Sequence, residues 1–216
     1  MKKNEQFIIT INRELGSGGR TVGEKLAEKL GVDYYDKALI KALMSKYHLG
    51  VKEIETLKGR NHSWWAEFKR TISLGNKASQ SQYFKPSVGD EPDLLTTDDI
   101  FKDEQEILKG IAEAESCIIA GRSGFYVFRN HPNRLSVLIQ APLEQRIQRV
   151  MTKQNMTYDE AKSTIAKIDK MRVNYIQKYT KSSRYDTRNY DIVLSMQGLT
   201  EEAACNIILE YINSQQ

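Results

Sequence analysis

The first 36 residues contain the feature that most constrains the fold: an apolar run, a cluster of glycines and a helical pattern, in that order. Residues 7–11, Phe-Ile-Ile-Thr-Ile, are typical of a buried strand, and residues 32–35 predict a second one. Between them, four apolar residues recur at helical spacing before the stop signal Gly31: Val22, Leu26, Ala27 and Leu30. This order predicts a βαβ unit, and therefore a parallel sheet with a right-handed crossover.

The remaining sequence continues this alternation of strands and helices. Strands are expected over residues 116–120, 135–140 and 191–194. Helices are expected over residues 37–58, 98–115 and 200–212, after Pro142, and, as one long helix or two short ones, over residues 157–179. Residues 59–97 carry the weakest pattern, and the polar stretch 75–93 indicates a loop or a mobile lobe. The chain is therefore predicted to be an α/β protein.

Composition excludes several classes of protein. The formal net charge of +4 suits a protein that handles anionic small molecules but does not argue for nucleic acid. With two cysteines, Cys117 and Cys205, both in apolar or helical patterns, and three histidines without paired spacing, neither a disulfide nor a zinc site is expected. No apolar stretch approaches the ~20 residues of a membrane span, and no apolar signal segment precedes the first strand, so we expect a cytoplasmic protein.

The glycine turn after the first strand predicts a phosphate-binding loop. Gly16-Ser17-Gly18-Gly19 leads into Arg20-Thr21 at the start of the expected helix, where backbone amides and the positive helix end favour an anion. A tight turn without a ligand is the alternative. Against the usual pattern G-x-x-x-x-G-K-[ST], Arg13 stands at the first glycine, Gly19 at the lysine and Arg20 at the hydroxyl position. Positive charge for the phosphates would then come from Arg13, Arg20 or Arg122.

Five segments together resemble the cytidylate-kinase-like family, a branch of the nucleoside monophosphate kinases. They cover most of the chain except residues 55–95, and the turn Gly-Ser-Gly-Gly-Arg is itself typical of this branch. The matching segments are residues 9–40 (ITINRELGSGGRTVGEKLAEKLGVDYYDKALI), 117–124 (CIIAGRSG), 138–150 (LIQAPLEQRIQRV), 167–180 (KIDKMRVNYIQKYT) and 185–194 (YDTRNYDIVL).

The resemblance implies a three-layer α/β/α fold with a five-stranded parallel sheet, like that of adenylate kinase. It implies a core of residues 1–36, 98–145 and 186–216, a helical acceptor-binding lobe over 37–97 and a mobile lid over 146–185. The implied reaction moves the γ-phosphoryl group of ATP, with Mg²⁺, to a nucleoside monophosphate, and the resemblance favours a pyrimidine one such as CMP. In such chemistry the protein positions the reactants and neutralises charge, a task that suits arginine.

The resemblance also assigns roles to single residues. The donor-phosphate loop comprises Arg13, Gly16, Ser17, Gly18, Gly19, Arg20 and Thr21. The acceptor side is assigned Asp36, Gln105 and Arg122, and Thr21 and Asp36 would order Mg²⁺. The lid contributes Arg146, Arg149, Asp169 and Arg172, with Tyr175 and Tyr179. The four charged lid residues, together with Arg20 and Arg122, are the catalytic candidates.

Each assignment has a structural alternative. Asp36 is also a helix cap, Arg122 a turn residue, and Arg146 and Arg149 a solvated helix face. Asp169 and Arg172 have the i,i+3 spacing of a surface ion pair. Trp64-Trp65 fits an apolar patch in the acceptor lobe, a homodimer contact or a base-stacking site.

Two departures leave turnover open. The loop lysine is absent, and Ala120 ends the strand where a metal-ordering carboxylate is often found. A nucleotide sensor or pseudo-kinase without turnover is therefore the main alternative. A nucleic-acid-binding protein that uses the basic stretch 162–188 is a weaker one, because acidic residues dilute that stretch.

Overall fold

The computed structural model describes residues 1–36 and 98–215. The helix expected over 37–58, the Trp64-Trp65 pair and the loop expected over 75–93 lie outside the described residues. The chain divides into two compact units, one of residues 1–36 and 116–216 and one of residues 37–115. Within the described residues, the sheet and every helix other than α5 belong to the first unit.

The first unit contains a five-stranded parallel sheet, as the resemblance implies. Its strands are β1 (Ile8–Arg13), β2 (Asp33–Tyr35), β3 (Cys117–Ala120), β4 (Arg134–Gln140) and β5 (Ile192–Ser195). They lie in the order β2-β3-β1-β4-β5, and every neighbouring pair is parallel. The strand order places β1 at the centre, paired with β3 on one side and β4 on the other.

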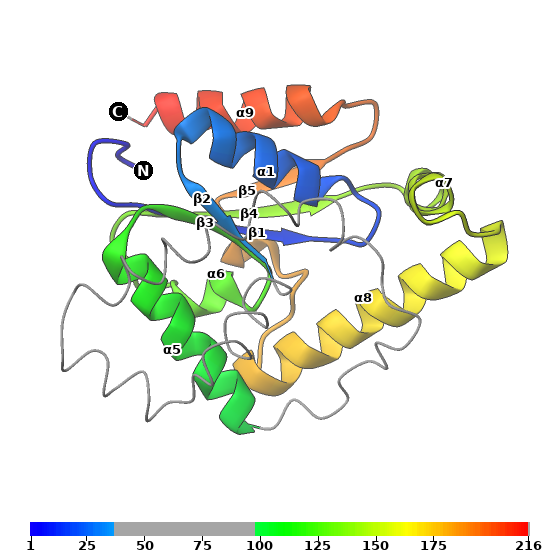
Figure 1. The fold of residues 1–216 in the computed structure, drawn as a ribbon, viewed down its shortest axis with the longest axis horizontal. Helices are drawn as coiled ribbons and strands as arrows, with labels where there is room; N and C mark the ends of the chain where they lie inside the picture. Colours follow the sequence, from blue (N-terminus) through cyan, green and yellow to red (C-terminus); the bar gives the residue numbers. More distant parts are fainter. Residues whose placement is uncertain (37–97, 216) are drawn as a thin grey trace, which may run out of the picture. The chain divides into compact units, whose positions relative to one another are not determined.

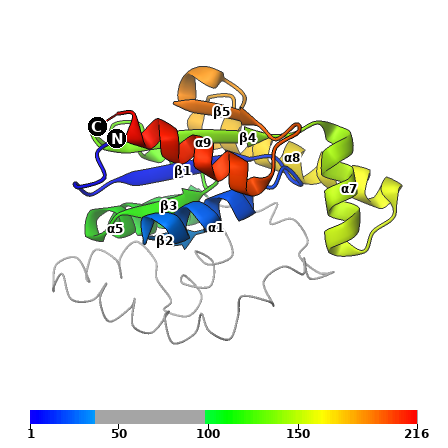
Figure 2. The same ribbon diagram turned by 90° about the horizontal axis from the view of Figure 1, so that it is seen from above.

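Helices of this unit cover both faces of the sheet (Figure 1). They are α1 (Gly19–Leu30), α6 (Gly124–Val127), α7 (Leu143–Gln154), α8 (Tyr158–Thr180) and α9 (Glu201–Asn213). On one face, α1 and α9 pack side by side, and their apolar residues join alternate strand residues such as Ile9, Ile11 and Val137 in one cluster (Figure 2). On the other face, Phe125 of α6 and Ile176 of α8 pack with Leu138. The α/β/α fold class is therefore confirmed.

Local signals explain where helices α7 and α8 begin and end. Thr157 caps α8 with a capping box, in which its side chain accepts from the Glu160 amide and its own amide donates to the Glu160 carboxylate. Residues 158–180 thus form one helix, not two. Pro142 immediately precedes α7, and Asn155 ends it in the left-handed conformation. The apolar faces of α7 and α8 meet through Ile147, Val150, Ala161 and Ile165.

Two short helices were not predicted from the sequence: α6 and the 3₁₀ turn η1 (Thr187–Asn189). Both are about one turn long, which is too short for a hydrophobic period to be read. In the second unit, α5 (Asp98–Ala114) matches the predicted helix and buries Phe101, Ile107 and Leu108. Among the helices of residues 1–36 and 98–215, none has the length and apolar character to cross a membrane.

Candidate functional site

The candidate site lies at the carboxyl edge of the sheet, where the chain leaves the central strand. From β1 the chain goes on through α1 to the β2–β3 side of the sheet, whereas β4 and β5 lie on the other side. In open α/β sheets such a switch point leaves a crevice beyond the strand ends, and ligands bind there. The loop Glu14–Gly18 follows β1 directly, and the predicted phosphate loop is therefore at the switch point.

The glycine loop has the backbone conformation that its sequence predicts. Gly16 and Gly18 have φ angles of 80° and 85°, in the left-handed region that favours glycine. A Cβ on Gly16 would lie 2.7 Å from the carbonyl oxygen of Arg146, so the loop also packs against the backbone of α7. Helix α1 begins at Gly19, its N-cap residue Gly18 has no side chain to cap it, and the Gly19 amide donates to the Ser17 hydroxyl at 3.4 Å. The positive end of this helix favours an anionic ligand.

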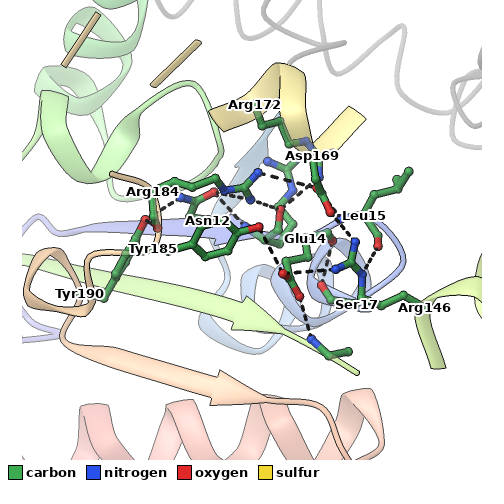
Figure 3. A network of polar contacts seen from close by, with 12 residues as sticks. Asn12, Glu14, Leu15, Ser17, Arg146, Asp169, Arg172, Arg184, Tyr185 and Tyr190 are labelled. Carbon is green, nitrogen blue, oxygen red and sulfur yellow. Dashed lines mark hydrogen bonds and ion pairs between the residues drawn. The ribbon is translucent and has the colours of Figure 1, made fainter. Parts of the chain in front are cut away.

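Arg146 and Asp169 bind the loop from α7 and α8 (Figure 3). Arg146 donates from Nε to the Leu15 carbonyl at 2.9 Å and forms an ion pair with Asp169. Asp169 accepts from the Leu15 amide at 3.1 Å. Both residues are buried, with relative exposures of 7% and 8%. Neither the solvated helix face nor the surface ion pair considered from the sequence describes them, and these two residues form one polar network with the loop.

Two residues of this network were missed by sequence reasoning: Glu14 and Arg184. The Glu14 carboxylate accepts from the Ala141 amide at 3.1 Å and from the Tyr185 hydroxyl at 3.2 Å, and lies 3.2 Å from Arg146 Nη1. It therefore ties the loop to the end of β4. Arg184 has zero exposure, and its Nη2 donates to the carbonyl of Arg13 at 2.7 Å.

The donors of Arg184 are only partly used within the protein. Nη2 also reaches the Asn12 side chain at 3.2 Å, and Nη1 lies 3.7 Å from Asp169. Nε and Nη1 have no hydrogen-bond partner among the described residues. Buried donors without partners are costly, so they indicate that a further acceptor belongs in the site.

Arg172 adds a further positive charge. Its Nη1 donates to the carbonyl of Arg13 at 3.1 Å and to Asp169 at 3.3 Å. Removal from water, followed by the like charge of Arg13, lowers the pKa of Arg172 to about 9. The charged form of this arginine is thus destabilised here, and an anion would relieve that cost.

We define the guanidinium cluster as Arg13, Arg146, Arg172 and Arg184 with the carboxylates of Glu14 and Asp169. Four positive and two negative groups leave a formal charge of +2 beside the glycine loop. Excess charge of one sign, mostly removed from water, is stabilised by a ligand of the opposite sign. Guanidinium groups bind phosphate oxygens in two-point geometry. The arrangement is therefore suited to a polyphosphate.

Arg122 lies at the carboxyl end of β3, as predicted. It has a positive φ of 51°, and its guanidinium stacks 4.8 Å from the ring centre of Tyr175 on α8. Burial, with the positive charge of Arg13 contributing, lowers the pKa of Arg122. Arg122 is therefore a half-buried cation that packs against α8 and interacts electrostatically with Arg13, not a solvated turn residue.

The remaining predicted residues lie around the start of α1. Arg149 donates to the Thr21 hydroxyl at 3.4 Å and forms an ion pair with Glu201, the first residue of α9. Arg20 donates to Glu24 at 2.8 Å, and its Nη1 lies 3.8 Å from Asp36. Gln105 is half-buried on α5, which belongs to the other unit.

The donor set for a metal is small. Among residues 1–36 and 98–215 there is no group of three or more His, Cys, Asp or Glu side chains that would hold a metal ion. Thr21 and Asp36 offer oxygen ligands of the type that Mg²⁺ prefers. Two protein oxygens fit a metal that arrives with phosphate and keeps several waters, not one caged by the protein.

Sequence reasoning missed Glu14 and Arg184 for identifiable reasons. Glu14 stands inside the loop, where the glycines drew attention, and a single acid there has no motif of its own. Arg184 lies in the irregular segment before η1, one residue ahead of the segment whose resemblance was recognised. Its sequence signal was an arginine directly preceding Tyr-Asp-Thr-Arg, but its burial depends on how that segment packs against β1.

Comparison with known proteins agrees with this geometry. The sequence profile described as "Cytidylate kinase-like family" matches residues 8–198. The cytidylate kinase of Sulfolobus acidocaldarius is 28% identical over 206 residues, which is 95% of this chain and 93% of that protein. Four cytidylate kinases from Saccharolobus islandicus strains are 24% identical over 111 residues, so the match spans 51% of this chain and 58% of each of those proteins.

Solved structures share the fold. An uncharacterized protein from Eubacterium ventriosum has a TM-score of 0.68 and 26% identity, covering 97% of this chain and 99% of that chain. Shikimate kinase from Bacteroides thetaiotaomicron has a TM-score of 0.51 and 16% identity, with the same coverage of both chains. At that identity the second likeness concerns the fold alone.

Proposed function

The chain belongs to the cytidylate kinase-like family, and from this premise we propose that it is a nucleotide phosphotransferase. It moves the γ-phosphoryl group of ATP to a nucleoside monophosphate. The bond between the γ-phosphorus and its bridging oxygen breaks, and a bond to a phosphate oxygen of the acceptor forms. The products are ADP and a nucleoside diphosphate.

The observation that carries the proposal is the guanidinium cluster beside the glycine loop. Its formal charge of +2 supports a polyphosphate ligand, as do the buried Arg184 donors that lack a hydrogen-bond acceptor among the described residues. The amides at the start of α1 would bind the donor phosphates, as in other loops of this type. Phosphoryl transfer requires mainly positioning and charge stabilisation, which these groups supply.

The lid residues have a distinct role in the proposal. Arg146 and Asp169 fix the loop, because both bind the backbone of Leu15. Arg172, held by Asp169 and by the carbonyl of Arg13, presents positive charge to the transferring group. Arg122, at the end of β3, would contact the acceptor phosphate.

Magnesium would be held by Thr21 and Asp36 together with the phosphates and water. When bound, the ion neutralises charge on the polyphosphate. Arg149 places the Thr21 hydroxyl by donating to it, and Arg20 lies within 3.8 Å of Asp36. These arginines orient the two oxygen ligands.

The acceptor is proposed to be a pyrimidine monophosphate such as CMP. Its support is the family and the Sulfolobus acidocaldarius relative, a cytidylate kinase that aligns over 95% of this chain. Acceptor choice is expected to depend on residues 37–97, which lie outside the described residues.

A coupled ADP-release assay tests the proposal. ATP and Mg²⁺ are combined with CMP, dCMP, UMP, AMP, GMP or shikimate, and turnover highest with CMP is expected. Arg122→Ala should abolish transfer while the melting temperature stays near that of the wild type. Arg129→Ala is the matched control, because Arg129 also stacks on a tyrosine, 4.1 Å from the ring centre of Tyr126. Its carbonyl accepts from Arg134 at the start of β4, so Arg129 lies at the edge of the sheet opposite the candidate site. Turnover with shikimate and not with any nucleotide would refute the proposal.

A nucleotide sensor without turnover is the second candidate. Two observations favour it: Gly19 stands where the loop lysine is usual, and β3 ends in Ala120 where a carboxylate is often found. It predicts that ATP raises the melting temperature although no acceptor releases ADP. The same assay, run beside a thermal-shift titration, separates the two functions.

A further inference from the structure

We propose that Arg13 replaces the missing loop lysine, through an exchange of side chains between the first and seventh positions of the loop. This inference rests on the proposed function and names the residue that neutralises the donor β- and γ-phosphates. In the usual pattern, position one is glycine and position seven is lysine. Here position one is Arg13 and position seven is Gly19.

The two positions share one volume in the structure. A Cβ built on Gly19 would lie 2.7 Å from Cβ of Arg13 and 3.3 Å from its Cγ. The aliphatic stem of Arg13 thus fills the space in which a side chain at position seven would begin. A lysine at position seven and an arginine at position one exclude each other, which gives a physical reason why both positions differ from the usual pattern.

The head of Arg13 extends from there toward the end of β3. A Cβ on Gly121 would collide with Nη1 of Arg13, and Gly121 has a φ of 82°, so glycine leaves room for the guanidinium. Arg13 lies close enough to lower the pKa of both Arg122 and Arg172. Its guanidinium is therefore near the end of the loop, among the groups assigned to phosphate.

Within the part of the chain that the structure describes, the Arg13 guanidinium has no anionic partner of its own. Among residues 1–36 and 98–215, no carboxylate forms an ion pair with its guanidinium, although its backbone amide and carbonyl are both hydrogen-bonded. A cation that is half-buried beside other cations gains most from a polyanion.

The other two arginines suggested by the sequence have different positions. Arg20 lies along α1, where it donates to Glu24 and approaches Asp36. Arg122 stacks on Tyr175 at the end of β3. Of these three arginines, only Arg13 has side-chain carbons in the space where the side chain of the usual loop lysine would begin.

Titration calorimetry of the full chain tests the exchange with three variants. Arg13→Met keeps the stem and removes the charge. Gly19→Lys alone places a second side chain in the occupied volume. The double variant Arg13→Gly/Gly19→Lys restores the usual pattern. Lys29→Met is the control, since it removes one positive charge from the exposed last turn of α1, ~15 Å along the helix from Gly19. Each protein is titrated with ATP–Mg²⁺ and with AMP, which lacks the β- and γ-phosphates.

The expected pattern is specific. Arg13→Met should weaken ATP binding about 10- to 100-fold, the range for a hydrogen bond to a charged group, and leave AMP binding unchanged. Gly19→Lys alone should lower the melting temperature, and the double variant should recover wild-type ATP affinity to within about fivefold. Lys29→Met should bind both nucleotides as the wild type does.

Three results would overturn the exchange while leaving the proposed function intact. They are wild-type ATP affinity in Arg13→Met, equal loss of ATP and AMP affinity in Arg13→Met, or a folded double variant with no recovery. If the double variant does not fold, Arg13→Met decides alone. A wild-type protein that binds neither ATP nor any other nucleoside triphosphate would instead refute the proposed function.

Discussion

Replacing Asp169 by asparagine should destabilise the protein strongly, although the substitution barely changes the side chain's shape. The carboxylate forms ion pairs with Arg146, Arg172 and Arg184, the last two at 3.3 and 3.7 Å, and the Asp169 side chain is only 12% exposed. In Asp169→Asn only the Glu14 carboxylate remains against four guanidinium groups. Removing one partner of a buried ion pair costs about 3–5 kcal/mol.

That free energy corresponds to a large fall in melting temperature. For a chain of this length 1 kcal/mol shifts the melting temperature by about 2–4 °C, so Asp169→Asn should melt roughly 6–20 °C below the wild type. Inorganic tripolyphosphate should raise the melting temperature of the variant more than that of the wild type, because the added anion replaces the lost carboxylate.

Differential scanning fluorimetry measures both effects, with Asp186→Asn as the matched control. Asp186 pairs with Arg188 at 2.8 Å, but the Arg188 side chain is 87% exposed, so loss of this pair should leave the melting temperature nearly unchanged. If Asp169→Asn melts within about 2 °C of the wild type, the claim that the cluster is a charged network dependent on Asp169 is refuted.

Three further predictions concern the loop, the cluster and pH. Gly16→Ala should destabilise the protein by more than the roughly 1–2 kcal/mol that a left-handed alanine costs, because the new Cβ would lie 2.7 Å from a carbonyl oxygen. The control Gly31→Ala should cost only the backbone strain, because its Cβ would meet nothing within 4 Å. Equal losses in the free energy of unfolding, measured in urea, would contradict this reasoning. Arg184→Lys should lower ATP affinity at least about tenfold, because a single ammonium cannot replace the planar guanidinium; wild-type affinity in calorimetry would count against it. Burial raises the pKa of three tyrosines, Tyr34, Tyr175 and Tyr190, to about 12. Because these tyrosines lose their protons near pH 10 in the unfolded chain, their contribution to the free energy of unfolding should be fully present below pH 10 and decrease as the pH rises toward 12. A melting temperature that stays constant over that interval would contradict the burial of these side chains.

The sheet and most helices could be predicted from the sequence because each depends on local pattern. Apolar runs such as residues 117–120 are buried strands whatever their partners are, and glycines at 16 and 18 fix the loop conformation through their φ angles. Cap signals at Thr157 and Thr200 mark helix starts within one residue. These features need no knowledge of distant contacts.

The electrostatics of the site could be predicted only in part. Arg146 was identified through the family resemblance, but its burial was not, because it arises from contacts such as that with Leu15, 131 residues apart in sequence. Glu14 and Arg184 likewise gain their roles from contacts across 127 and 171 residues. In the sequence, Arg13 and Gly19 are two separate differences from the usual loop pattern. Only the structure connects them, because it shows that their side chains would occupy the same space.

A crystal structure with Mg²⁺ and a non-hydrolysable ATP analogue tests the central claim most directly. The account predicts that oxygens of the triphosphate lie about 2.7–3.2 Å from amides at the start of α1 and from guanidinium groups of Arg13 and Arg184. A nucleotide bound elsewhere, with the glycine loop and these arginines free of phosphate at saturating concentration, would contradict it.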